Sequence, residues 1–423
     1  MSSYHNPIRQ NYIYAAVLFI IWPFMAALAS LKHYNKPWAK NVAWAFVAFF
    51  GFTFAIGSAN EGNDIVRYIA EYQALYNTHF TWEKAIDYFQ YSGEIDILRT
   101  LIAVVFSRFS DSQAVLTGVY GIIFGYFFSR NMWFVLERLE GKIKPYTVLL
   151  FACFFLAVPI WNINGFRMWT ATHVFLFGLL PYLFDGYKRG LWISCTAVLV
   201  HFSFIVPVSL LIMYSFVGSW LTLYFGMYLF TFFISEIDLG MINRYVENYT
   251  PEIFQERTKY YRRESKMEAM AEETAQRSWH IAYYGRALGW AVMGYLVLLY
   301  VKGKKFFADN KGWRDLFSFT LLFFSAANIL SMLPSGSRYL TVARLIALAL
   351  ITLYIQNNPQ KRLSSAYKYA AIPALLLFVL VSLRLGLLAV SATAVLGNPL
   401  IAIFTAGDTM SLNDFLMSLR RML

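Results

Sequence analysis

Five arginines stand inside or at the mouths of long apolar segments of this chain. They are Arg167, Arg286, Arg338, Arg344 and Arg384. An ionised side chain in hydrocarbon costs at least a few kcal/mol, roughly 2.5–3.5 on insertion scales, so such residues are kept mostly where they face a polar cavity or bind an anion. A guanidinium matches phosphate oxygens in bidentate geometry and keeps its charge. The arginines therefore predict a site for a negatively charged ligand.

Two short segments are the best candidates for lining that site. Arg167 follows Asn164 in a glycine-containing connector, where the oxygens of a ligand could approach. Arg338 opens a helix after the flexible turn at 334–337. Arg344 lies deeper in the same helix, on a face about 120° away at 100° per residue. We rank Arg167 and Arg338 first and Arg344 behind them, and we interpret Arg286 and Arg384 as structural.

Three further side chains are candidates for moving a proton. Asp64 begins an amphipathic stretch and Glu94 stands where a polar loop returns to the bilayer, so either is a general base or simply a helix-start carboxylate. His201 lies in the apolar run VLVHFSFIVP beside Ser203. A buried histidine is usually a hydrogen-bonded core residue. Because His201 lies deep in the membrane beside a serine, we give a structural role and a functional role equal weight. His173 is interpreted as structural.

Metal and nucleotide motifs give no competing chemistry. The chain has no HExxH, paired CxxC, DxD, P-loop or GxGxxG before a helix. Two E-x-D triplets, Glu94–Asp96 and Glu236–Asp238, stand at membrane boundaries and offer carboxylates that a hard cation prefers. Acidic pairs at helix ends are also favoured by the helix dipole alone. We therefore expect no metal and no cofactor.

The elements that position these residues are expected to be membrane helices. Of 423 residues, 58% are hydrophobic and 14% charged, whereas soluble domains carry about 25% charged residues. Apolar runs long enough to cross a bilayer recur throughout. They lie at about 11–31, 41–58, 97–110, 112–136, 146–162, 168–185, 191–214, 219–236, 281–301, 315–334, 338–356 and 367–391. We predict an all-α polytopic membrane protein with about 11–13 transmembrane helices.

The charge distribution predicts the orientation of these spans. The net charge of +12 is concentrated in short connectors, which marks them as cytoplasmic and gives no reason to expect nucleic acid. The basic connectors include residues 32–40, 138–144, 188–189, 302–305 and 361–362. Two polar loops, 59–96 and 237–280, then fall on the extracytoplasmic side. The number of spans agrees with this placement of both loops only if one segment is re-entrant or split. The two candidates for such a segment are 97–110 and 191–236.

Both loops are expected to carry short helices. An apolar stripe spaced as in a helix runs from Ile65 to Tyr76, and it is expected to lie on the membrane surface with its tyrosines at the headgroups. A second short helix is expected over 81–91, and the second loop is expected to be a polar helix from Thr250. Residues 1–391 form the transmembrane domain. The segment 392–423 carries an amphipathic helix from about Ser411.

The order of these motifs resembles a known family. The motifs are Asp64-Ile-Val-Arg-Tyr68, Glu94, Asn164-Gly-Phe-Arg167, His201-Phe202-Ser203 and Ser337-Arg338-Tyr339. In this order, over about residues 10–360, they resemble the EpsG-like branch of the Wzy-type polysaccharide polymerases. Two features depart from the pattern: the charged insertion at 250–280 is longer, and the carboxy-terminal segment has no counterpart.

The resemblance implies a glycosyltransferase of GT-C-like architecture in the bacterial inner membrane. Its substrates would be undecaprenyl-diphosphate-linked oligosaccharide units, joined on the periplasmic face into O-antigen, capsule or exopolysaccharide. Membrane lipids, a chain-length regulator and a flippase are the further candidate partners. The implied substrate-binding residues are Arg167, Arg338, Arg344, Asn164, Tyr68 and Tyr339. Asp64 or Glu94 would be the base, with His201 orienting or donating.

Two other functions fit parts of the same pattern. An O-antigen-ligase-like enzyme would use the same donor and similar arginines but a different acceptor. A lipid-linked oligosaccharide flippase or other transporter should show internal repeats and polar residues spread through both halves. No repeat is visible here, and the selected polar groups cluster toward one face, so we favour the polymerase.

Overall fold

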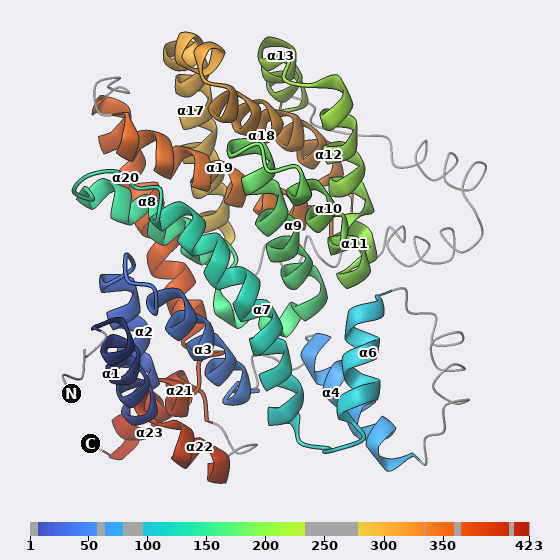
Figure 1. The fold of residues 1–423 in the computed structure, drawn as a ribbon, viewed down its shortest axis with the longest axis vertical. Helices are drawn as coiled ribbons and strands as arrows, with labels where there is room; N and C mark the ends of the chain where they lie inside the picture. The colour runs from blue at the N-terminus through green and yellow to red at the C-terminus, as the bar shows by residue number, and fades with distance from the viewer. Residues whose placement is uncertain are drawn as a thin grey trace, which may run out of the picture.

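The computed structural model describes residues 7–56, 64–78, 96–232, 278–333, 335–358, 365–405 and 410–422. Across these ranges the chain is almost entirely helical, and a single isolated bridge pairs Ser391 with Ser411. The predicted all-α polytopic membrane protein is confirmed (Figure 1). Four stretches have the length and composition to span a bilayer: Pro145–Phe184, Trp279–Asp309, Ser337–Asn357 and Ser365–Gly386.

The helices follow one another along the chain. The described elements are α1 (Pro7–Ile21), α2 (Pro23–Lys32), α3 (Ala39–Phe52), α4 (Asp64–Asn77), α6 (Ile97–Phe106), α7 (Gln113–Leu136), α8 (Pro145–Ala157), η2 (Ile160–Gly165), α9 (Phe166–Phe184), α10 (Arg189–Cys195), α11 (Ala197–Val200), η3 (Phe202–Phe204), α12 (Ile205–Val217), α13 (Leu221–Phe232), α17 (Trp279–Asp309), α18 (Lys311–Leu330), α19 (Ser337–Asn357), α20 (Ser365–Gly386), α21 (Ala392–Leu396), α22 (Pro399–Thr405) and α23 (Leu412–Met422).

Helix α19 forms the centre of the core. Every residue from Leu345 to Gln356 is buried, because this stretch is apolar on all sides and packs against α8, α17 and α18. The helix begins after a tight turn in which Ser335 has φ 64°. A Cβ at Gly336 would lie 1.7 Å from the Leu330 carbonyl, so only glycine fits there. The turn thereby fixes where the first residues of α19 project.

Helices α3 and α7 meet through glycine. A Cβ at Gly51 would lie 2.5 Å from the Thr117 carbonyl, and one at Gly121 would lie 2.7 Å from the Val47 carbonyl. Small residues let membrane helices approach to backbone contact in this way. The close contact fixes the position of the amino-terminal half of α7, which is the half that follows α6 in the chain.

The basic connectors after α7 and after α9 lie at one end of the bundle, here called the basic end. Arg138 pairs with Asp185 at 2.6 Å, and the Gln356 amide donates to the Glu140 carbonyl at 2.6 Å. The connector after α7, the connector after α9 and the end of α19 therefore lie together. This grouping agrees with the prediction that these connectors share one side of the membrane.

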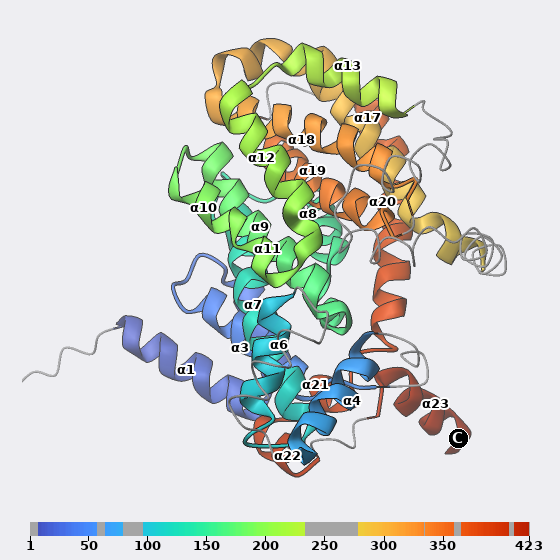
Figure 2. The same ribbon diagram turned by 90° about the vertical axis from the view of Figure 1, so that its right-hand side faces the viewer.

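The segment 97–110 does not form a transmembrane helix. Helix α6 has 10 residues, a length of about 15 Å against the roughly 30 Å of a bilayer core. Its buried Arg99 pairs with Glu71 of α4, and Arg108 donates to the Leu75 carbonyl. Figure 2 shows α4 and α6 side by side near one end of α7, as in Figure 1. These polar contacts explain why the segment pairs with α4 instead of crossing.

The second suspect is a re-entrant hairpin, residues 189–217. Helices α10 and α11 run back along α9, where Ser194 Oγ donates to the Phe175 carbonyl at 2.9 Å. The chain reverses at His201, and α12 returns to the basic end, where the Tyr214 hydroxyl donates to the Asp315 carbonyl at 3.1 Å. The hairpin thus supplies two short passes in place of the single span expected over 191–214. With α6 removed from the count, both polar loops fall on the same side.

The predicted amphipathic helix is α4, but its surroundings differ from the prediction. Tyr68 and Tyr72 are buried, at 1% and 0% exposure, against α6, α7 and η2. The expected position on the membrane surface with tyrosines at the headgroups is wrong, because protein covers the apolar stripe. The helices expected over 81–91 and from Thr250 lie outside the described residues, as does Glu94.

The carboxy-terminal segment packs beside the amino-terminal helices. The Trp22 indole nitrogen donates to the Val395 carbonyl at 2.6 Å, which ties α21 to the break between α1 and α2. Helix α23 is the amphipathic helix expected from about Ser411, and none of its residues is buried. Figure 1 shows α21, α22 and α23 grouped below α1 and α2.

Candidate functional site

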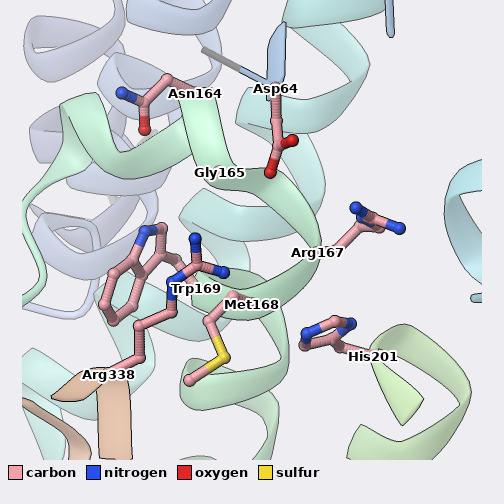
Figure 3. A pocket seen from close by; sticks show the side chains of 8 residues that line it. All are labelled: Asp64, Asn164, Gly165, Arg167, Met168, Trp169, His201 and Arg338. Atoms are coloured by element: carbon pink, nitrogen blue, oxygen red, sulfur yellow. The ribbon is translucent and has the colours of Figure 1, made fainter. Parts of the chain in front are cut away.

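A cavity of about 250 Å³ opens between four parts of the chain (Figure 3). They are the start of α4, the η2–α9 junction, the tip of the re-entrant hairpin and the start of α19. Its lining residues are Asp64, Asn164, Gly165, Arg167, Met168, Trp169, His201 and Arg338. Five of these residues were singled out from the sequence, and the fold brings them together from positions far apart in the chain.

Asp96 anchors one wall of this cavity. It stands immediately before α6 and is almost fully buried. Its Oδ2 accepts from Arg167 Nη1 at 2.9 Å and contacts His201 Nδ1 at 3.0 Å, and its Oδ1 accepts from the Phe202 backbone N–H at 2.8 Å. One carboxylate therefore joins α6, α9 and the hairpin tip.

The surroundings of Asp96 keep it ionised. Burial alone would raise its pKa, but the hydrogen bond and charge of His201, the Phe202 N–H and the charge of Arg167 together lower the pKa to about 2. At neutral pH the group is a fixed negative charge. It cannot donate a proton to a substrate, but it can orient a neighbouring base.

His201 is oriented for proton transfer by this carboxylate. Its backbone is extended between α11 and η3, which turns the side chain into the cavity. A neutral imidazole whose Nδ1 donates to a carboxylate carries its proton there, leaving Nε2 as the proton acceptor. Ser203 does not complete a nucleophile pair, because its hydroxyl contacts the Met168 sulfur at 4.0 Å. This is the geometry that a general base requires.

Arg167 is held from two sides. Its Nε donates to the Tyr68 hydroxyl at 2.6 Å, while Nη1 binds Asp96. Burial raises the pKa of Tyr68 to about 12, so the phenol stays neutral. The charge of Arg167 is thus partly compensated by Asp96, and its guanidinium is fixed at the cavity wall.

Arg338 is the more available cation. It is exposed in the first turn of α19 and lines the cavity, and within the described part of the chain it forms no ion pair. Figure 3 shows its guanidinium beside Trp169, across the cavity from Arg167 and His201. Asp64 reaches the same cavity from α4, with Arg67 Nη2 at 3.2 Å from its Oδ1.

A second cavity, of about 390 Å³, adjoins the first. Asn164 and Trp169 line both, so they form the wall between them. Arg344 lines the second cavity, away from Arg338. A Cβ at Gly289 would lie 3.1 Å from Arg344 Nη2, so the guanidinium packs directly against the backbone of α17.

The remaining predicted residues lie behind the cavity or away from it. Tyr68 supports Arg167, and the Tyr339 hydroxyl donates to the Ser203 carbonyl at 2.8 Å, which steadies the hairpin tip. Neither tyrosine lines the first cavity, although both were expected to bind substrate. Arg384 Nη1 lies 3.5 Å from His280 Nε2, and Arg286 lies over the Tyr283 ring.

Asp96 is the residue of this site that sequence reasoning missed. It entered only as part of a carboxylate triplet that could bind a cation. Arg167, His201 and the Phe202 N–H already occupy its oxygens, which disfavours that use. In the described part of the chain, no three His, Cys, Asp or Glu side chains gather as metal ligands would. The available signal was a carboxylate directly before an apolar helix, where a partner is needed.

His173 is structural, as interpreted from the sequence. It is fully buried beside Phe124 and Phe128, and its carbonyl accepts from the Asn131 amide at 2.8 Å. It therefore belongs to the packing between α7 and α9 and takes no part in the cavity.

Comparison with known proteins gives one match. The model of the EpsG family matches residues 42–388, a range that includes every residue lining the first cavity. No curated protein and no solved structure matches the chain.

Proposed function

The chain belongs to the EpsG family. We propose that it polymerises lipid-diphosphate-linked oligosaccharide units. The family is associated with polysaccharide polymerase activity of a glycosyltransferase type. The proposed carrier is undecaprenyl diphosphate, and the proposed products are O-antigen, capsule or exopolysaccharide. The reaction would take place on the periplasmic face of the bacterial inner membrane, opposite the basic end.

One observation carries this proposal: a carboxylate-oriented histidine shares a polar cavity with two arginines. Glycosyl transfer from a diphosphate needs a base for the incoming hydroxyl and positive charge for the leaving group. His201 with Asp96 supplies the first requirement. Arg338 and Arg167 supply the second. The cavity thus holds both halves of the chemistry without a nucleotide-binding motif.

The proposed step balances as follows. A hydroxyl at the non-reducing end of the acceptor unit attacks the anomeric carbon of the growing chain. His201 Nε2 takes the hydroxyl proton, and Asp96 stabilises the imidazolium that forms. The bond between the anomeric carbon and the diphosphate oxygen breaks, and its electron pair leaves with the lipid diphosphate. Arg338 and Arg167 stabilise that developing charge from fixed positions.

This assignment changes the base expected from the sequence. Asp64 or Glu94 was expected to take the proton, with His201 in a supporting role. Asp64 lines the cavity and remains the alternative base, while Glu94 lies outside the described residues. We favour His201 because its second nitrogen is already fixed by Asp96, whereas the neighbour of Asp64 is Arg67 of its own helix.

Trp169 and Asn164 are the proposed sugar contacts. The indole ring packs against Gly165, where a Cβ would lie 2.9 Å from the ring. The side chain also lines both cavities. An aromatic face presented to a cavity suits the apolar face of a sugar ring, and the Asn164 amide can bond sugar hydroxyls.

The test is polymerisation by the purified protein in liposomes. Lipid-linked repeat units are supplied, and the products are separated on a gel. A ladder of lengths on the lipid carrier supports the proposal. Transfer of glycan only to another lipid or a protein would support a ligase, and movement of the substrate without new bonds would support a transporter.

Two variants connect that test to the site. His201→Gln should abolish the ladder, because an amide cannot take the proton. Glu137→Gln is the matched control, since Glu137 pairs with Lys40 at the basic end and is far from the cavity in the fold. An unchanged ladder from His201→Gln would contradict the assignment of the base.

A further inference from the structure

A third cavity, of about 680 Å³, lies between α2, α3, α7, α8 and α20. Its lining is almost wholly apolar and includes Phe46, Met132, Leu380 and Leu383. Arg384 is the one charged side chain that reaches its lining in the described part of the chain. A cavity of this size and polarity suits a hydrocarbon chain.

The three cavities adjoin one another in series. Leu156 and Trp161 line both the apolar cavity and the Arg344 cavity. Asn164 and Trp169 line both the Arg344 cavity and the cavity with Asp64, Arg167 and His201. The segment η2, Ile160–Gly165, thus passes along all three. Apolar surface, a single cation and a polar reaction cavity follow one another along this segment.

Arg344 in the middle cavity is a cation without a protein counter-ion. In the described part of the chain it forms no ion pair, and its Nε has no hydrogen-bond partner. The guanidinium packs against Gly289 and beside Gly285, which leaves its other side toward the cavity. Burying an unpaired charge is strongly unfavourable, so the position calls for an anion.

We propose that the three cavities bind the three parts of one lipid-linked substrate. The polyprenyl tail lies in the apolar cavity. The diphosphate lies at Arg344 and extends toward Arg338, and the sugar lies against Trp169. This inference rests on the proposed function and assigns a tail site and a phosphate anchor to it. The order of apolar, cationic and polar surfaces matches the order of tail, phosphate and sugar in the ligand.

The first experiment maps the tail directly. A sugar-free polyprenyl diphosphate carrying a photoreactive group on its terminal isoprene is added to the protein in liposomes and crosslinked. We expect crosslinked peptides from α3 and α20, competed by unlabelled polyprenyl diphosphate and reduced by Arg344→Gln. Crosslinks scattered over other lipid-facing helices would overturn the inference. So would labelling that ordinary phospholipid displaces as well as polyprenyl diphosphate does, because a bilayer acyl chain would then be the occupant.

The second experiment uses a variant that fills the cavity. Ala27 lines the apolar cavity, whereas Ala29 of the same helix does not, so Ala27→Trp and Ala29→Trp form a matched pair. We expect Ala27→Trp to raise KM for the full-length carrier by about tenfold while leaving KM for a two-isoprene carrier unchanged. Ala29→Trp should leave both values unchanged. An equal effect of Ala27→Trp on both carriers, or no effect on either, would overturn the tail site.

Failure of this inference is separable from failure of the proposed function. Specific crosslinking without any polymerisation would leave the tail site standing and contradict the polymerase. Polymerisation with crosslinks outside the cavity would support the polymerase and contradict the tail site. Melting temperatures of all variants establish that each protein is folded before these comparisons are made.

Discussion

The Asp96 carboxylate lies 3.0 Å from His201 Nδ1, although 105 positions separate the two residues in the chain. Asp96 comes from the start of α6, which lies against α4, and His201 comes from the tip of a hairpin whose ends lie at the basic end. The pair therefore exists only when two independent parts of the fold meet. Its chemistry, an oriented imidazole beside two arginines, suggests the following experiments.

Replacing the carboxylate should impair turnover more than substrate binding. Asp96→Asn removes the charge that orients His201 and stabilises its protonated form, so we expect kcat to fall by about 100-fold or more with little change in KM. Initial rates of chain extension check this result. Asp185→Asn, which changes a carboxylate at the basic end, is the control. If Asp64→Asn reduced kcat more than Asp96→Asn does, Asp64 would be the base instead.

The ionisation of Asp96 should make stability depend on pH in a defined window. Its folded-state pKa of about 2 lies below the ordinary value of 3.8, so the carboxylate favours the folded state above pH 4. That contribution, about 2 kcal/mol at 1.36 kcal/mol per pKa unit, is lost as the pH falls from 4 through 2. Thermal unfolding of wild type and Asp96→Asn should therefore differ more at pH 5 than at pH 2. The difference should shrink below pH 4, and a gap that widened there would contradict the assignment.

Two glycines of α17 offer a matched test of the Arg344 position. A methyl group at residue 289 would lie 3.1 Å from Arg344 Nη2, whereas one at residue 285 would meet Nη1 at an ordinary 3.8 Å. Gly289→Ala should therefore displace the guanidinium and raise KM for the lipid-linked substrate several-fold. Gly285→Ala should change KM by less than about twofold. Equal KM values for the two variants would show that the guanidinium position does not matter for binding.

The contact between α3 and α7 should be sensitive to any side chain at Gly121. A Cβ there would lie 2.7 Å from the Val47 carbonyl, so Gly121→Ala forces the helices apart and should cost about 1–3 kcal/mol of stability. Gly226→Ala is the control, since nothing lies within 4 Å of a Cβ at that position. Melting temperatures in detergent measure both. A Gly121→Ala protein as stable as Gly226→Ala would mean that this contact is not tight.

Much of the site was predictable because intramembrane charges are rare and informative. Asp64, Asn164, Arg167, His201 and Arg338 were selected by their type and position, and they share one cavity. Their assembly could not be derived from spacing alone, because they come from four separate parts of the chain. The motif order identified the family, and the family match confirmed it.

What the sequence did not predict has identifiable physical causes. Hydropathy over 191–214 cannot distinguish one full span from a hairpin, because both are apolar, so the position of His201 at a tip was missed. The stripe on α4 showed that Tyr68 and Tyr72 face something apolar, but not whether lipid or protein covers them. Asp96 was missed for the same reason: its partners come from α9 and from the hairpin.

The re-entrant hairpin also has a consequence for biogenesis. Asp96 is translated about one hundred residues before His201, and the two are joined only after α9 and the hairpin have been inserted. Had residues 189–217 crossed the membrane as one helix, His201 would not lie at a tip beside Asp96. Every later helix would then cross the membrane in the opposite direction. The contact between them is therefore made in only one of the two insertion topologies. The Asp96–His201 pair therefore forms only when the second half of the protein is inserted in the correct direction.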